Sequence, residues 1–198
     1  MTKFNENGRS MVEMLGVLAI IGVLSAGGLA GYSKAMFKHK LNSTMDQITM
    51  LVTNIRTMYG TQGNYDGLAA NVTDLGIIPP VMGSAPSALT NPFKGQVKVL
   101  ESKTNAADVS AVGAALGSSA TAFVVTYEGL PKEACIALAT ADFGSGAGSG
   151  FIGVTIGADA TNVVGNNEGE VYQMGGDTGA IKLCSDQGEN ATVSWKFY

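Results

Sequence analysis

The chain has 198 residues, of which 45% are hydrophobic and only 14% are charged. Its 12 basic and 16 acidic residues give a formal net charge of -4, which excludes a broad cationic surface for nucleic acid. This length allows one globular domain beside the long apolar segment near the N-terminus.

That segment is an almost unbroken apolar run from Met11 to Tyr32. At a rise of about 1.5 Å per residue, about 20 apolar residues are enough to cross a bilayer core about 30 Å thick. Glu13 is the exception in this run, and an acidic side chain inside a membrane usually has a partner and a function. The composition therefore predicts a membrane-spanning helix that carries one functional carboxylate.

The residues before this run resemble a processing signal. A short polar leader ends at Gly8, Arg9 follows it, and Glu13 is the fifth residue counted from Arg9. This pattern resembles the N-terminus of type IV prepilins. The resemblance implies that a prepilin peptidase cuts between Gly8 and Arg9, removes residues 1–8 and methylates the new N-terminus at Arg9. Arg9 departs from the family pattern, in which an apolar residue usually follows the cut.

The role of Glu13 can be argued from its charge. Cleavage creates an α-ammonium group at Arg9, which is cationic at neutral pH. In a filament core of packed apolar helices, Glu13 of one subunit can neutralise the N-terminus of its neighbour. A charge left unpaired in such a core is heavily penalised. We therefore expect this pair to set the register of assembly.

Two other interpretations of the N-terminus are open. A secretory signal peptide also has a basic start, an apolar centre and small residues before its cleavage site, and residues 28–30 fit that description. A plain signal anchor is the second. Lys34, Lys38 and Lys40 follow the span, and charge counting alone favours the opposite orientation. The motif and a downstream cysteine pair favour placing the C-terminal region in an oxidising compartment.

The helix is expected to continue to Tyr59, because no proline interrupts residues 9–59. After Phe37, apolar residues recur every three or four positions, which is the pattern of one helix face: Leu41, Met45, Ile48, Val52, Ile55 and Tyr59. Each glycine costs a helix about 1 kcal/mol relative to alanine. Gly27, Gly28 and Gly31 therefore mark either close packing between helices or a segment that melts on assembly.

Residues 60–198 are expected to form a globular head. An irregular connector with a short helix within residues 66–76 leads to strands at residues 96–101, 121–127, 151–157 and 192–198. A helix is predicted within residues 131–142. In the last strand, Val193, Trp195 and Phe197 share one face and need a core, so this strand is expected to lie inside the sheet and not at a frayed terminus. The best candidate for that core is the apolar face of the long helix between Leu41 and Tyr59. A long helix followed by antiparallel strands is an α+β fold.

Cys135 and Cys184 are the two cysteines of the chain. They are either two buried free thiols or a disulfide that closes a loop of about 50 residues, for which the chain-entropy model gives at most about 4 kcal/mol. The resemblance favours the bridge, because type IVb pilins close a large C-terminal region with such a pair. Residues 130–135 and 190–197 are similar to that family's pattern.

Neither a catalytic site nor a metal site is predicted. The chain has one histidine, His39, it has no nucleophile-elbow sequence, and both cysteines are better explained as a bridge. The glycine-rich residues 144–150 lack the lysine and the following helix that a phosphate loop needs. The acidic and amide side chains between residues 159 and 177 fit no calcium-loop spacing. No cofactor and no enzymatic activity are expected.

The chain is thus identified as resembling type IV pilins, most closely type IVb. The resemblance implies a pilin fold, in which the long helix packs on an antiparallel sheet beside a disulfide-bounded C-terminal region. It implies a structural subunit, interpreted as a major pilin, held in the inner membrane and then polymerised into a homopolymeric surface filament for adhesion, aggregation, conjugation or motility.

The resemblance also implies partners. These are the prepilin peptidase, an assembly ATPase, a platform protein and, in a diderm, a secretin. The alternative functions are a type II secretion pseudopilin, a minor pilin, and a non-polymerising, membrane-anchored periplasmic binding domain.

Overall fold

The computed structural model describes residues 11–102, 120–143, 150–157, 174–176 and 179–198. Gly8 and Arg9, the glycine-rich residues 144–149, and the candidate calcium ligands in residues 158–173 and at Asp177 lie outside the described residues. The chain divides into two compact units, Met1–Lys40 and Leu41–Tyr198.

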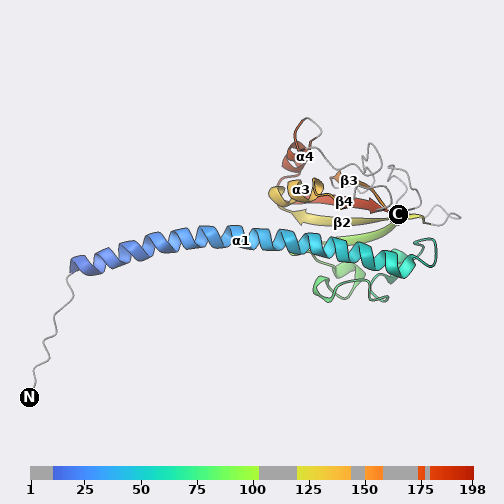
Figure 1. Cartoon of the computed structure of the whole chain (residues 1–198), viewed down its shortest axis with the longest axis horizontal. Coiled ribbons are helices and arrows are strands. Elements are labelled where there is room, and N and C mark those ends of the chain that lie inside the picture. The colour runs from blue at the N-terminus through green and yellow to red at the C-terminus, as the bar shows by residue number, and fades with distance from the viewer. Residues whose placement is uncertain (1–10, 103–119, 144–149, 158–173, 177–178) are drawn as a thin grey trace, which may run out of the picture. The chain divides into compact units, whose positions relative to one another are not determined.

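Helix α1 (Met11–Tyr59) is continuous through Gly27, Gly28 and Gly31 (Figure 1). The predicted long helix is therefore confirmed over these residues. All side chains of residues 11–36 are exposed, whereas Ile48 and Ile55 in the second half of the helix are completely buried. The three-and-four spacing of the apolar residues thus corresponds to one buried helix face in the second unit.

A four-stranded antiparallel sheet forms the centre of the second unit (Figure 1). Its strands are β1 (Val97–Ser102), β2 (Ala122–Leu130), β3 (Phe151–Ile156) and β4 (Ala191–Phe197). Their order in the sheet is β1-β2-β4-β3. The C-terminal strand β4 pairs with β2 on one side and β3 on the other, so it is an internal strand, as its apolar alternation predicts. With the long helix, this sheet confirms the predicted α+β fold.

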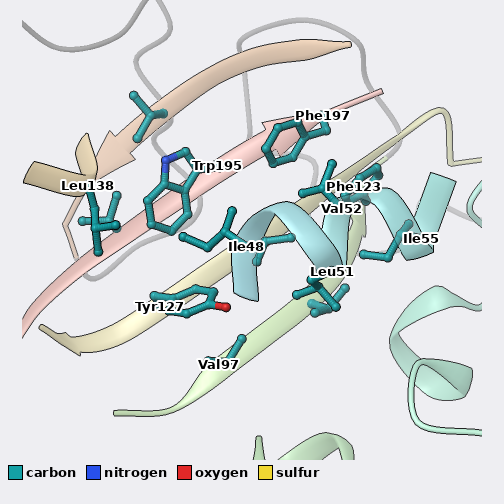
Figure 2. Packing of buried hydrophobic residues seen from close by; sticks show 14 of the residues in the cluster. Ile48, Leu51, Val52, Ile55, Val97, Phe123, Tyr127, Leu138, Trp195 and Phe197 are labelled. Atoms are coloured by element: carbon teal, nitrogen blue, oxygen red, sulfur yellow. The ribbon is translucent and has the colours of Figure 1, made fainter. Parts of the chain in front are cut away.

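The core lies between α1 and one face of the sheet. Val125, Trp195 and Val154 are cross-strand neighbours on β2, β4 and β3, and they belong to one hydrophobic cluster with Ile48 and Leu51 of α1. Figure 2 shows the α1 side chains facing the strands that carry Trp195 (β4) and Tyr127 (β2). The apolar face of α1 between Ile48 and Tyr59 and the apolar face of β4 therefore bury each other.

Aromatic rings fill much of this core. Trp195 makes edge-to-face contacts with Tyr127 of β2 and with Phe143, at ring-centroid distances of 5.7 and 5.6 Å. Burial raises the pKa of Tyr127 far above its ordinary value, so its hydroxyl stays neutral at all physiological pH values. Edge-to-face ring contacts of this kind add to the apolar packing of the core.

The opposite face of the sheet is also covered. Thr192, Ser194 and Lys196 alternate with the apolar residues of β4, and every residue of β4 is buried. Ser194 and Thr126 of β2 share a buried hydroxyl–hydroxyl hydrogen bond of 2.8 Å. Polar side chains therefore line a buried face, where pairing of this kind compensates the loss of water.

The connector between α1 and β1 contains three short helices. These are α2 (Leu68–Asn71), which confirms the helix predicted within residues 66–76, and the 3-10 helices η1 (Pro80–Met82) and η2 (Pro86–Ala88), each started by a proline. The side-chain amide of Asn54 on α1 donates a hydrogen bond of 2.8 Å to the carbonyl of Ile77. This bond fixes the connector against the long helix.

A turn built around Asn91 joins the connector to the sheet. The buried Asn91 accepts hydrogen bonds through its side-chain oxygen from the backbone N–H groups of Phe93 (2.9 Å) and Gly95 (3.0 Å). Its amide donates to the carbonyl of Glu128 at 2.9 Å. A Cβ atom at Gly95 would overlap that same carbonyl oxygen, so only glycine fits where the turn meets β2.

The disulfide Cys135–Cys184 joins α3 (Lys132–Ala139) to α4 (Ala180–Gln187), with the two Cα atoms 5.9 Å apart. The predicted bridge and the predicted helix within residues 131–142 are both confirmed. Both cysteines are completely buried and belong to the hydrophobic cluster. Helix α4 was not predicted from the sequence, because neither a side-chain cap nor a proline marks its start, whereas Pro131 marks the start of α3.

We expect Gly95→Ala to lower the free energy of unfolding by about 1–3 kcal/mol, because the added methyl group overlaps the Glu128 carbonyl and forces β2 or the turn to move. Urea unfolding of the detergent-solubilised chain measures this. Gly175→Ala is the matched control, since no atom of the described residues lies within 4 Å of a Cβ atom there. Equal midpoints for the two variants would contradict the proposed close approach.

We expect Cys135→Ser, Cys184→Ser and the double variant to lose similar stability, about 2–4 kcal/mol each, because all three lose one shared bond. Urea unfolding gives the values. The unmodified chain should not react with a thiol reagent under denaturing, non-reducing conditions. Two reactive thiols per chain, or additive losses in the double variant, would contradict the bridge.

Candidate assembly interface

The candidate functional site is the first half of α1. Among the described residues, α1 is the one helix long and apolar enough to cross a membrane by length and composition, a criterion that a signal sequence near the N-terminus also meets. No group of three or more His, Cys, Asp or Glu residues that could hold a metal ion occurs in the part of the chain that the structure describes. The segment itself presents an exposed helix surface.

This surface is apolar around the whole helix. The large hydrophobic side chains between residues 11 and 36 are all exposed: Met11, Val12, Met14, Leu15, Val17, Leu18, Ile20, Ile21, Val23, Leu24, Leu29, Tyr32 and Met36. Apolar surface in water costs about 25 cal/mol per Å², and soluble monomers rarely expose a contiguous patch above a few hundred Å². The segment therefore requires lipid or packed protein around it.

Glu13 lies in the first turn of α1 and is exposed in the single chain. An acidic side chain at this end of a helix interacts favourably with the unpaired N–H groups there. Its expected counter-charge is the α-ammonium group of Arg9 in a second subunit, and Arg9 lies outside the described residues. The inter-subunit pair stays a prediction.

Gly27, Gly28 and Gly31 are helical and open to their surroundings. Nothing lies within 4 Å of a Cβ atom built at any of them, so their small size serves no contact within the described chain. Glycine on a helix surface lets another helix approach closely. The same openness is found at Gly16 and Gly22, which the sequence analysis did not single out.

The structure does not gather the predicted residues into one site. Glu13 and the three glycines follow one another along the first unit, while Cys135 and Cys184 stabilise the second unit. The glycines are spaced along an exposed helix, and the disulfide is a feature of the fold. The arrangement is that of an association surface on a helix that continues into a disulfide-stabilised domain, and not that of a reaction centre.

Arg56 is a structural residue that sequence reasoning missed. Its guanidinium group lies over the ring of Phe197 on β4, 5.4 Å from the ring centroid, and any Cβ atom at Gly150 would overlap it. Burial raises the pKa of nearby Tyr65, and the positive charge of Arg56 acts in the opposite direction. Arg56 thus fastens the C-terminal end of α1 to the sheet, a role that only the fold makes visible.

Solved structures similar to the chain include a crystal structure of TcpA, a type IV pilin from Vibrio cholerae El Tor biotype. Its TM-score is 0.48 at 14% identity, with 81% of this chain and 99% of that chain covered. The crystal structure of a type IV b pilin from Salmonella typhi gives a TM-score of 0.43 at 19% identity, with 78% of this chain and 97% of that chain covered.

Two curated relatives are each described as a major structural subunit of bundle-forming pilus. The relative from Escherichia coli O127:H6 (strain E2348/69 / EPEC) is 26% identical over 195 residues, which cover 98% of this chain and 90% of the relative. The relative from Escherichia coli O111:H- is 28% identical over 149 residues, which cover 74% of this chain and 70% of the relative.

The Bundlin family model matches residues 34–194, from the middle of α1 to β4. This range contains β1, β2, β3, the first part of β4, both disulfide-linked helices and the packed half of α1. The chain therefore belongs to the Bundlin family and is a type IV pilin, a structural and not an enzymatic protein.

Proposed function

We propose that the chain is the major structural subunit of a type IVb-like pilus and polymerises through the first half of α1. The observation that carries this proposal is the family match, combined with a helix whose residues 11–36 are exposed on every side. The two curated relatives, both major structural subunits of a pilus, support the same role. Self-association into a surface filament follows from that role.

Before assembly, the apolar residues 11–32 lie in the inner membrane. Assembly exchanges lipid around this segment for neighbouring helices, and lipid tails are as apolar as leucine side chains. The hydrophobic effect therefore contributes little to the exchange, and close packing and charge pairing decide it. Gly27, Gly28 and Gly31 either allow close helix packing or lower the penalty for local melting in the filament.

Processing precedes assembly in this proposal. A prepilin peptidase removes the leader, residues 1–8, by cutting between Gly8 and Arg9, and methylates Arg9. The mature chain then consists of the helix of residues 9–59 and the head of residues 60–198. An assembly ATPase and a platform protein add subunits, and a secretin passes the filament through an outer membrane where one exists.

We expect the mature chain to begin at Arg9 with an N-methyl group, because Gly8 and the spacing to Glu13 fit a prepilin cut. Mass spectrometry of the N-terminal peptide from sheared filaments decides this. A mature chain that begins near Leu29 or Gly31 would indicate an ordinary signal peptide and would remove the apolar segment on which the proposal depends.

We expect Glu13→Ala to leave the subunit folded and membrane-inserted but to reduce filament yield about ten-fold or more, because the neighbour's α-ammonium group loses its counter-charge. Filaments are counted by electron microscopy, and subunit abundance is measured in the membrane fraction. Glu13→Gln, which keeps the size and removes the charge, is the matched variant. Normal yields from both variants would refute the pairing.

A further inference from the structure

The outward face of α1 in the second unit carries no charge over its last three turns. The exposed residues between positions 49 and 58 are Thr49, Met50, Thr53, Thr57 and Met58, and we call this surface the outer threonine face. It lies opposite the buried side of the helix. A helix face that meets water normally carries charged and polar side chains, so an uncharged one is unusual.

The three threonines present little free polarity to solvent. Thr49, Thr53 and Thr57 each donate their hydroxyl hydrogen to the backbone carbonyl four residues earlier, at 2.9, 2.7 and 2.8 Å. Because each hydroxyl is bonded inside the helix, the surface around it is more apolar than the composition suggests. Met50 and Met58 add flexible thioether side chains that adapt to irregular partners.

Charge distribution restricts what can cover this face. Residues 41–198 contain 7 basic and 14 acidic residues, which is a formal charge of -7 for the second unit. Copies of such a unit repel one another, and the repulsion is smallest where the touching surfaces are uncharged. Arg56, the one charged residue within positions 49–58, is half-buried beside Phe197 and does not belong to the outer threonine face.

We propose that the outer threonine face is a contact surface for a second copy of this chain in the filament. The inference rests on the proposed polymerisation and adds a contact in the head to the one made by the apolar half of α1. Both surfaces belong to the same helix, α1, so the proposed contact continues along the element on which the assembly surface begins. A lipid surface fits less well, since helices that lie on membranes carry lysine and arginine on their polar side.

Oxidation of the native methionines tests the proposal without any substitution. Met50 and Met58 are 51% and 44% exposed in the single chain. We expect hydrogen peroxide to form methionine sulfoxide at both positions about five-fold or more slowly in filaments than in detergent-solubilised subunits. Subunits in vesicles of phosphatidylethanolamine and phosphatidylglycerol should react as fast as those in detergent.

Peptide mass spectrometry gives the rates. Equal rates in filaments and in solubilised subunits would overturn the proposal. So would protection that is already complete in vesicles, because lipid would then be the occupant. A chain that forms no filament at all would instead refute the proposed function, so the two failures are distinguishable.

A charge placed on the face provides the second test. Thr53→Lys should keep the subunit folded, because position 53 is exposed, and should lower filament yield about ten-fold through an unpaired buried cation. Ser185→Lys on α4 is the matched control, since Ser185 is also exposed and also bonds the carbonyl four residues earlier. Filament yield near the unmodified level from Thr53→Lys would overturn the proposal.

Discussion

The packing of the second half of α1 against the sheet is the interaction on which the rest of the molecule depends. Ile48 and Leu51 of the helix and Trp195 of β4 share one cluster, so neither the helix stripe nor the internal strand has a core without the other. Because the N-terminal segment continues the same helix without a break, the surface proposed for assembly begins on an element that the fold already holds. Arg56 and the bond from Asn54 to Ile77 add polar fastenings to this packing.

Physical reasoning on the sequence predicted the features that repeat along the chain. The spacing of Ile48, Val52 and Ile55 predicted the buried face of α1, and the alternation of Val193, Trp195 and Phe197 predicted an internal strand. Features that depend on contacts between distant segments could not be read in this way. The Asn91 turn needs the Glu128 carbonyl on another strand, and the buried pair of Thr126 and Ser194 needs a covered second sheet face.

The sequence likewise predicted only part of the candidate site. Composition alone predicted the exposed apolar half of α1, since a run of this length cannot remain in water. The outer threonine face was not predicted, because threonine counts as a polar residue in a sequence. Only the structure shows that its hydroxyl is hydrogen-bonded to the helix backbone. The counter-charge of Glu13 belongs to a second subunit, so the residues of a single chain cannot supply it. Resemblance to a family was needed to name Gly8, Arg9 and the bridge.

The position of the bridge has a mechanical consequence. A filament subunit under tension is loaded along its chain, and unfolding normally releases the full contour length of the unravelled segment. Cys135 and Cys184 are 49 residues apart in sequence, and at about 3.3–3.6 Å per residue the segment between them could extend by about 160–175 Å. Because the disulfide joins the two ends of this segment, pulling on the chain cannot extend it. A stretched subunit therefore yields by a shorter step and keeps α3, α4 and the chain between them tied together, ready to refold when the load falls.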